Sequence, residues 1–321
     1  MSIAKWQRFC VVGVGAHARN KLIPALQTNG QQIVGIVSSQ SPESLPMGSI
    51  FGSIEEAVQD LPADTVFIIS TPPTLHFEQV KCVVKAGRDV IVEKPAFVFA
   101  RETQEIAALA TERGIVVVEG FMHRYTMLYK RFMDYWNSHR QRIMALEAVF
   151  VIPGLPPGTF RQESTVASSC LYDMGCYAIS LLADMRLPLQ GLQILHGSPP
   201  GKVHEEIHIS GLLDGVEILI RIGVGLSYQN LVALRTHDDE TARFGPFFYG
   251  RPGEKWITLH SFGTMEKELL EDGDAFQAMF AVPRSQWLFN QVERFAQMTE
   301  VTACLEALGR DLLVSPKNWV K

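Results

Sequence analysis

The sequence predicts an α/β protein of two domains, in which a doubly wound parallel sheet precedes an α+β domain with a mostly antiparallel, open sheet. Between Arg8 and Glu119, short β-branched apolar runs alternate with helix-patterned segments, which is typical of parallel strands joined by crossover helices. Later in the chain, Asp214-Gly215 separates two alternating runs and is a strong hairpin signal, which favours antiparallel pairing. At roughly 150 residues per domain, a chain of 321 residues fits two domains.

The first domain is expected to span residues 1–123. Helix signals separate its strands: Ser53 followed by Glu56 is a capping box, and Gly87 and Gly114 stand where two helices end. Five strands are predicted: Phe9 to Val14, Ile33 to Val37, Thr65 to Ser70, Asp89 to Glu93 and Ile115 to Glu119.

The second domain is expected to span residues 124–321, and its pattern changes to hairpins. In the run Val216 to Val224, β-branched residues share one face, while Glu217, Leu219 and Arg221 lie on the other, which predicts a sheet with one open face. We expect a final helix, Ser285 to Met298, to pack on that sheet. The remaining predicted elements are helices at Thr126 to Ser138 and Ser169 to Asp184, and strands at Ala145 to Val151, Leu192 to His196 and Val203 to Leu212.

Composition excludes several classes of protein. With 47% apolar and 20% charged residues the chain has the composition of a folded protein, and its net charge of -5 argues against nucleic acid as a partner. The five cysteines form no CxxC pair and have no zinc-ligand spacing, so we expect no metal site and a reducing, cytoplasmic location. We find no signal peptide, and no apolar stretch approaches the 18 or so residues that cross a membrane.

A dinucleotide site is predicted where the first strand meets the first helix. The run Gly13-Val14-Gly15-Ala16-His17-Ala18 is a GxGxxA element of the Rossmann type. The first glycine permits a tight turn, the second lets a pyrophosphate approach the backbone, and Ala18 lets the helix pack closely on the strand. Glycines also occur in ordinary strand-to-helix turns, but the position at the first crossover favours a nucleotide.

The end of the second strand bears on the choice between NADP and NAD. NAD-preferring domains usually carry Asp or Glu there, to bind the ribose hydroxyls. This chain has Val37-Ser38-Ser39-Gln40-Ser41, with no carboxylate before Glu43. Ser38 and Ser39 can donate hydrogen bonds to a 2′-phosphate, although no Arg or Lys stands beside them. We therefore expect NADP, with NAD as the alternative.

Two further elements carry candidate chemistry. Lys94 follows the fourth strand at the edge where ligands bind in open α/β sheets, although most lysines are solvated surface residues. Asp173 and Tyr177 are four residues apart, so on a helix a carboxylate and a phenol share a face. Taken alone, that pair also suits a helix-start Asp and a half-buried Tyr.

Together these elements resemble the Gfo/Idh/MocA family of oxidoreductases, over the first domain and onward to about Ser180. The motifs that carry the resemblance are Gly13 to Ala18, Thr71-Pro72 with Leu75-His76, Ala86-Gly87 followed by Asp89-Val90, Glu93-Lys94-Pro95 and Asp173-Met174-Gly175. The resemblance implies a nicotinamide dinucleotide in the first domain and a sugar, polyol or dihydrodiol against the sheet of the second.

The resemblance also implies roles for particular residues. Lys94 corresponds to the family's catalytic lysine and Asp173 to its partner aspartate. Many members have His at the position of Tyr177. A tyrosine there resembles the branch that contains glucose-fructose oxidoreductase and the dimeric dihydrodiol dehydrogenases, in which the tyrosine is the proposed acid/base. The chain departs from the family at Ala167-Ser168-Ser169-Cys170, in place of a glycine cluster, and at Pro73, in place of Asn. Further cofactor contacts are expected from Thr71, Pro72, His76, Glu93 and Lys94.

The side chains of Lys94, Asp173 and Tyr177 suit hydride transfer at a carbinol carbon. Removing the hydroxyl proton, or protonating the alkoxide in reverse, needs an acid/base, and a free Tyr with a pKa of about 10 is a poor one. A nearby Lys94 ammonium would favour the phenolate of Tyr177 and stabilise oxyanion charge, while Asp173 would hold Lys94 in place. Arg124 and Arg161 are candidates for binding a substrate phosphate or carboxylate, and for Arg124 a salt bridge at a domain interface is the competing interpretation.

The sequence therefore predicts an NAD(P)-dependent oxidoreductase acting on a secondary alcohol or ketone of a sugar-like substrate, which includes a keto-sugar carried on a nucleotide. One alternative is a trans-dihydrodiol or aldose dehydrogenase. A second alternative is a dinucleotide-sensing regulatory protein without turnover, which would not need Lys94, Asp173 and Tyr177 together. The open sheet further predicts a homodimer or homotetramer, because an apolar face would otherwise meet water.

Overall fold

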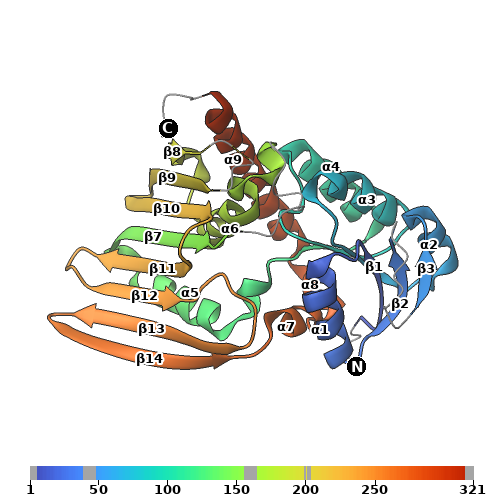
Figure 1. Ribbon diagram of the computed structural model, residues 1–321, viewed down its shortest axis with the longest axis horizontal. Coiled ribbons are helices and arrows are strands. Elements are labelled where there is room, and N and C mark those ends of the chain that lie inside the picture. Colours follow the sequence, from blue (N-terminus) through green and yellow to red (C-terminus); the bar gives the residue numbers. More distant parts are fainter. Residues whose placement is uncertain (1–5, 39–47, 155–164, 199, 201–203, 315–321) are drawn as a thin grey trace. The chain divides into compact units, whose positions relative to one another are not determined.

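The computed structural model describes residues 6–38, 48–154, 165–198, 200 and 204–314. The chain divides into two compact units, which we describe separately. Unit 1 comprises Met1–Phe121 and Phe276–Thr299, and unit 2 comprises Met122–Ala275 and Glu300–Lys321. Figure 1 shows the elements of both units, coloured along the sequence.

Unit 1 is built on a six-stranded parallel sheet with the order β3-β2-β1-β4-β5-β6. This is the doubly wound order in which the strand sequence reverses beside the first strand. The strands are β1 (Arg8–Val12), β2 (Gln32–Val37), β3 (Ser49–Phe51), β4 (Val66–Ile69), β5 (Val90–Val92) and β6 (Val117–Glu119). The five predicted strands are present, and β3 was not predicted because two of its three residues are exposed and it has no buried apolar run.

Helices cover the sheet of unit 1. A π-helical turn (Ala18–Leu22) leads into α1 (Ile23–Thr28), followed by α2 (Ile54–Asp60), α3 (Pro73–Lys85), α4 (Ala100–Arg113), α7 (Ala275–Phe280) and α8 (Arg284–Phe289). The predicted helix start and helix ends are confirmed. Ser53 caps α2 by accepting a hydrogen bond from the Glu56 amide at 3.2 Å, and Gly87 and Gly114 end α3 and α4 with positive φ.

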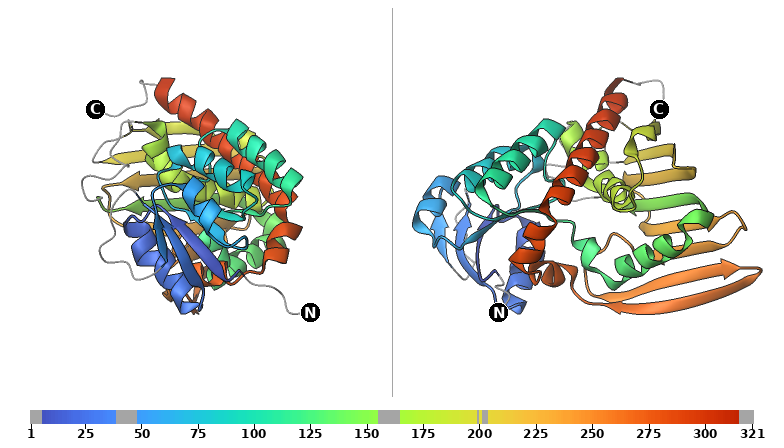
Figure 2. Two further views of the ribbon diagram at one scale, coloured as in Figure 1. Left: turned by 90° about the vertical axis from the view of Figure 1, so that its right-hand side faces the viewer. Right: turned by 180° about the vertical axis from the view of Figure 1, so that it is seen from behind.

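Unit 2 is built on an eight-stranded sheet with the order β14-β13-β12-β11-β7-β10-β9-β8, in which only β7 and β10 pair in parallel. The Asp214-Gly215 hairpin joins β9 to β10, and both of its turn residues have positive φ. The strands are β7 (Ile143–Ile152), β8 (Gln193–Gly197), β9 (Glu205–Leu213), β10 (Val216–Val224), β11 (Gln229–Thr236), β12 (Thr241–Gly245), β13 (Gly253–Ser261) and β14 (Thr264–Asp272). The last two form a long hairpin (Figure 2).

One face of this sheet is covered by helices and the other is open. Short 3-10 turns (Met122–Tyr125, Arg140–Arg142) flank α5 (Met127–His139), whose Phe132 packs on Phe244 of β12. A 3-10 turn (Val166–Ser168) precedes a π-helical turn (Leu171–Gly175) and α6 (Cys176–Asp184), which a 3-10 turn (Leu189–Gly191) follows. In β10 Val216, Ile218, Ile220 and Ile222 are buried, whereas Leu219 is 41% exposed, so the predicted open face is confirmed.

The C-terminal part of the chain differs from our prediction. The predicted helix is two helices, α8 and α9 (Gln291–Val314), and the segment Phe276–Thr299 groups with unit 1 instead of residues 124–321. Phe295 and Met298 belong to the apolar core that α2, α3 and α4 form on the parallel sheet, so the start of α9 packs there and not on the antiparallel sheet. The predicted division after residue 123 lies two residues beyond Phe121.

The described residues contain neither a candidate membrane span nor a candidate metal cluster. None of the helices in this part of the chain combines the length and apolar character that a membrane span requires. No group of three or more His, Cys, Asp or Glu side chains among the same residues is arranged to hold a metal ion.

Candidate functional site

The glycine turn after β1 has the geometry expected of a dinucleotide site. Gly13 has a φ of +82°, and a Cβ there would stand 2.7 Å from Cγ2 of Thr71, so the turn tolerates no side chain at this position. A Cβ on Gly15 would have no atom within 4 Å. The space beside the Gly15 backbone is therefore open, and the contact of Gly15 with a pyrophosphate stays a prediction.

The helix after the turn is tied back to the end of β5. Nε2 of His17 lies 3.0 Å from Oε1 of Glu93, and the His17 ring contacts Phe276 edge to face. Burial acts to raise the pKa of Glu93, but His17 and Lys94 outweigh it, so that the pKa lies below its usual value. Ala18 is fully buried and begins a π-helical turn, a feature often found at functional sites.

The carboxyl ends of β1, β4 and β5 are neighbours. The amide of Ser70 donates to the Val12 carbonyl at 2.8 Å, and the amide of Glu93 donates to the Ile69 carbonyl at 2.9 Å. The glycine turn, the Thr71-Pro72 segment and the Glu93-Lys94 segment therefore start side by side along one edge of the sheet. The cofactor candidates of unit 1 lie together there.

His76 lies under this edge. Its Nε2 is 2.8 Å from the Thr71 carbonyl, and its Nδ1 is 3.1 Å from the Pro95 carbonyl and 3.2 Å from that of Ala96. Only 1% of the side chain is exposed. Burial lowers the pKa of His76, and the three carbonyl contacts oppose that shift. His76 thus connects two loops as a buried core residue, and its contact with a cofactor stays a prediction.

The segment that carries Lys94 is held on its other side by Glu119. Oε1 of Glu119, the last residue of β6, accepts a hydrogen bond from the Ala96 amide at 2.9 Å. His76 and Glu119 together fix the backbone just after Lys94, whose side chain is half-buried.

Of the two serines predicted to bind the 2′-phosphate, the structure describes Ser38. Ser38 follows β2 and its amide donates to the Phe51 carbonyl at 3.3 Å, so the backbone at the end of β2 is held against β3. Ser39 and Arg161 lie outside the described residues.

In unit 2, Asp173 and Tyr177 lie on one continuous helical stretch. Asp173 is in the π-helical turn, and Tyr177 is the second residue of α6. The phenol of Tyr177 is 6% exposed and donates to Sδ of Met122 at 3.5 Å. The predicted helix carries both residues. Asp173 is half-buried, whereas Tyr177 is buried.

Aromatic rings surround Tyr177. The ring centroids of His123, Phe150 and Phe248 lie 5.1, 5.5 and 5.7 Å from its own. His123 is completely buried and also contacts Phe248, at 5.5 Å. The rings around Tyr177 are therefore part of the core of unit 2, and the sequence did not place them around the candidate acid/base because they come from distant segments of the chain.

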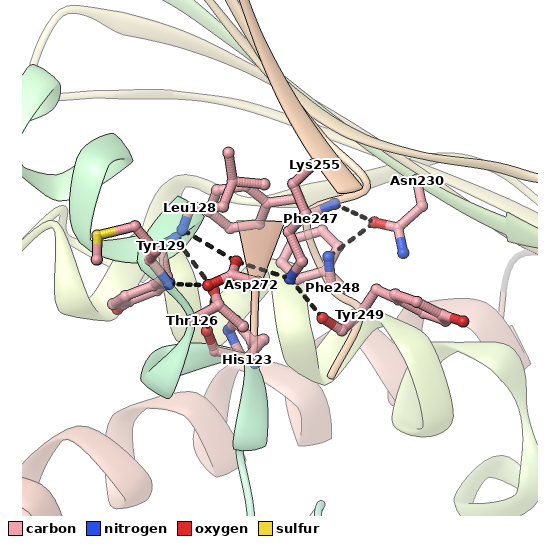
Figure 3. Close-up of polar contacts among 11 residues, drawn as sticks. His123, Thr126, Leu128, Tyr129, Asn230, Phe247, Phe248, Tyr249, Lys255 and Asp272 are labelled. Atoms are coloured by element: carbon pink, nitrogen blue, oxygen red, sulfur yellow. Dashed lines mark hydrogen bonds and ion pairs between the residues drawn. The ribbon is translucent and has the colours of Figure 1, made fainter. Parts of the chain in front are cut away.

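We call the rings of His123, Phe150, Phe247 and Phe248 around Tyr177 the aromatic layer. A buried ion pair secures the backbone beside it (Figure 3). Nζ of Lys255 lies 2.7 Å from the Tyr249 carbonyl and 3.4 Å from Oδ2 of Asp272. Asp272 in turn accepts hydrogen bonds from the first amides of α5, those of Met127 and Leu128. Burial lowers the pKa of Lys255, and Asp272 opposes that shift.

Asn230 completes the support. Its Oδ1 accepts hydrogen bonds from the amides of Phe247 and Phe248, at 3.0 and 2.8 Å. Its Nδ2 donates to the Tyr228 hydroxyl at 3.2 Å. Asn230 thus holds the backbone of Phe247 and Phe248, and the Phe248 ring packs on Tyr177.

Arg124 is engaged within unit 2. Its guanidinium makes a bidentate ion pair with Asp184, at 2.8 and 3.0 Å, and the Tyr129 hydroxyl donates to the same carboxylate at 2.5 Å. Burial and the charge of Asp184 raise the pKa of Tyr129 well above its usual value, and Arg124 opposes that rise. A substrate anion at Arg124 would have to share it with Asp184. The salt bridge weighed from the sequence is present, inside one unit.

A sequence model of an oxidoreductase family with an NAD-binding Rossmann fold, Gfo/Idh/MocA, matches residues 7–121. A D-xylose 1-dehydrogenase (NADP(+)) from Haloferax volcanii is 27% identical over 180 residues, which cover 54% of this chain and 55% of the relative. A dTDP-3,4-didehydro-2,6-dideoxy-alpha-D-glucose 3-reductase from Actinomadura kijaniata is 28% identical over 181 residues, with 54% of each chain covered. The match spans about half the length of these curated relatives.

Solved structures extend the likeness over the whole fold. A 3-ketoreductase from Actinomadura kijaniata, in complex with NADP and TDP-benzene, has a TM-score of 0.81 at 18% identity and covers 95% of this chain and 97% of its own. An aldose-aldose oxidoreductase from Caulobacter crescentus has a TM-score of 0.80 at 13% identity and covers 96% and 98%. At such identities the likeness shows the fold alone. Residues 7–121, which include the glycine turn described above, are therefore similar to the NAD-binding domain of the Gfo/Idh/MocA oxidoreductase family.

Proposed function

We propose that the chain is an NADP-dependent oxidoreductase that transfers a hydride between the nicotinamide and a secondary alcohol or ketone of a sugar-like substrate. The observation that carries the proposal is the edge of the parallel sheet, where the glycine turn, Glu93 and Lys94 follow neighbouring strands. The relatives named as an NADP-dependent xylose dehydrogenase and a ketosugar reductase belong to the same reaction class.

The residues at this edge suit the cofactor. The open space beside Gly15 and the buried Ala18 fit a pyrophosphate at the start of the first helix. The end of β2 carries Ser38 and no acidic residue before Glu43, which removes the repulsion that a 2′-phosphate would meet. NADP is therefore the proposed cofactor, and NAD is the comparison in every binding test.

When bound, NADP supplies or accepts the hydride. In the proposed reaction Tyr177 gives a proton to the ketone oxygen during reduction and takes the hydroxyl proton during oxidation. Lys94, as an ammonium group, stabilises negative charge on that oxygen and favours the phenolate of Tyr177. Asp173 supports Lys94 by its opposite charge. The aromatic layer keeps the Tyr177 ring in one orientation.

Binding and turnover together test the proposal. The affinities for NADPH and NADH are measured by nicotinamide fluorescence, and absorbance at the nicotinamide band then follows reaction with aldoses, keto-sugars, nucleotide-linked keto-sugars and dihydrodiols. We expect tighter binding of NADPH and turnover with a sugar ketone or alcohol. Turnover with dihydrodiols or aldoses alone would support the alternative dehydrogenases. Tight cofactor binding without turnover on any of these would support a dinucleotide sensor instead.

We also propose that a second copy of this chain covers the open sheet face of unit 2. Leu212 and Leu219 are 66% and 41% exposed there and line a hollow of about 770 Å³. The same hollow contains two acidic and two basic side chains, Glu147, Glu217, Arg235 and Arg243. A patch that carries apolar surface and both signs of charge is able to pair with itself across a two-fold axis.

Sedimentation velocity at micromolar concentration tests this interface. We expect a dimer or tetramer for the natural chain and dissociation for Leu219→Arg, which places a charge in the hollow. Leu313→Arg is the matched control, because Leu313 is 57% exposed on α9 and is not among the residues that line the hollow. A natural chain that sediments as a monomer would contradict the proposal.

A further inference from the structure

Glu205 is a buried carboxyl group that the proposed reaction does not use. It is the first residue of β9, pairs with Val224 of β10, and is only 3% exposed. Its Oε1 accepts a hydrogen bond from the Cys170 amide at 3.0 Å. A glutamate at the start of a strand ordinarily stays in water, so this burial needs a structural reason.

The reason is the helical turn that carries Asp173. Cys170 immediately precedes that turn, and the amides of Tyr172 and Asp173 both donate to the Ser169 carbonyl, at 3.2 and 3.1 Å. The Cys170 amide comes too early for a carbonyl within the turn, as with the first amides of any helix. Glu205 supplies the missing acceptor from another strand, across 35 residues of sequence.

We propose that Glu205 is a positioning residue for the reaction: through the Cys170 amide it fixes the turn that carries Asp173, and the fold around it is more stable when the carboxyl group is uncharged. The inference concerns the same site as the proposed function and rests on that function for its kinetic readout. Glu205 acts through Asp173, and the proposal gives it no contact with substrate or cofactor.

The surroundings of Glu205 favour the uncharged form. Burial raises its pKa to about 7; the amide and thiol of Cys170 act to lower it, and the charge of Asp173 acts to raise it. Burial and Glu205 raise the pKa of the Cys170 thiol well above its usual value, so the thiol remains protonated. The next residue, Glu206, points to the opposite sheet face, where it pairs with Arg221 at 2.7 Å and His208 at 2.9 Å.

The sign of the pH dependence follows from this shift. Because the pKa of Glu205 is higher in the folded protein than in the unfolded chain, its stabilising contribution is complete below pH 4.5 and is lost as pH rises through about 7. Above that pH a second negative charge lies buried near Asp173. We therefore expect the turn to loosen and turnover to fall on the alkaline side.

Thermal unfolding tests the inference without any assay of activity. At pH 8.5, Glu205→Gln is expected to unfold about 5 °C above the natural chain, and at pH 5.5 the two are expected to unfold within about 2 °C of each other. Glu206→Gln is the matched control. Arg221 and His208 hold the pKa of Glu206 below its usual value against the opposing effect of burial, so removing its charge should lower the unfolding temperature at pH 8.5.

Kinetics test the positioning role. In the natural chain kcat for the identified substrate is expected to fall with an apparent pKa near 7, and in Glu205→Gln this limb should disappear while KM stays the same. Glu205→Ala, which lacks the acceptor for Cys170, is expected to lose about tenfold in kcat at all pH values, a loss that Glu205→Gln restores.

The outcomes separate the two proposals. An alkaline gain in unfolding temperature for Glu205→Gln supports the buried acid even if the chain proves to be a sensor without turnover. If the chain turns over and the pH profiles of kcat for the natural chain and Glu205→Gln coincide, the positioning role is overturned while the proposed function stands. If Glu205→Gln shows no alkaline gain in unfolding temperature, the claim that Glu205 is held uncharged is overturned. If a variant fails to fold, the pH profile of kcat for the natural chain still tests the inference, because a kcat that does not fall near pH 7 contradicts it.

Discussion

The two candidate regions of this protein are built by different means. In unit 1 the residues that would hold the cofactor follow directly from strand ends, and backbone carbonyls and amides hold them, as His76 and Glu119 show. In unit 2, Tyr177 is held by rings from three distant segments and by a buried ion pair, Lys255 with Asp272. The first region is a local motif placed on a sheet edge, whereas the second depends on long-range packing.

This difference predicts that unit 2 is the more sensitive to a single distant substitution. Lys255→Ala leaves Asp272 buried without its cation, and losing one partner of a buried pair typically costs about 3–5 kcal/mol in unfolding free energy. Lys267→Ala, on the exposed side of the same hairpin, should cost less than about 0.5 kcal/mol. Urea titration measures both. A similar small loss in the two variants would mean that the ion pair does not secure the aromatic layer.

The glycine turn gives a matched pair of substitutions in unit 1. Gly13→Ala places a Cβ against Thr71 at a positive φ and should destabilise the fold by about 1–3 kcal/mol. Gly15→Ala meets no protein atom, so it should leave stability unchanged and raise the Kd for NADPH by about tenfold. Unfolding and fluorescence titration distinguish the two effects. If Gly15→Ala bound NADPH as the natural chain does, the pyrophosphate would not lie at this turn.

The smallest expected effect is at a helix end. Ser53→Ala removes the acceptor for the Glu56 amide at the start of α2 and should cost about 1 kcal/mol. Thr111→Ala is the control in the same unit, because the Thr111 hydroxyl only donates back to the Ala107 carbonyl within α4. Equal unfolding midpoints for the two variants would show that the cap contributes nothing measurable.

The sequence predicted unit 1 better than unit 2 for a physical reason. The turn at Gly13 to Ala18, the cap at Ser53 and the ends of α3 and α4 are determined by neighbours in the chain, and all are present. The packing of α9 is not local, since Phe295 and Met298 suit the apolar face of either sheet, and here we predicted the wrong one.

Individual residues of unit 2 were missed for the same reason. Lys255 and Glu205 occupy strands whose pattern makes them look solvated, and only partners on other segments, Asp272 and the Cys170 amide, account for their burial. The hydrogen bonds between Asn230 and the backbone of Phe247 and Phe248 likewise follow only from the structure.

The most direct test of the central claim compares Tyr177→Phe and Lys94→Ala with the natural chain, with kcat and the Kd for NADPH measured on the same preparations. A positioned acid/base contributes about 10² to 10⁴ in rate, so kcat should fall by that factor in each variant while NADPH still binds. Full turnover of Tyr177→Phe with the native substrate would contradict the assignment of Tyr177 as acid/base and leave that role to Lys94.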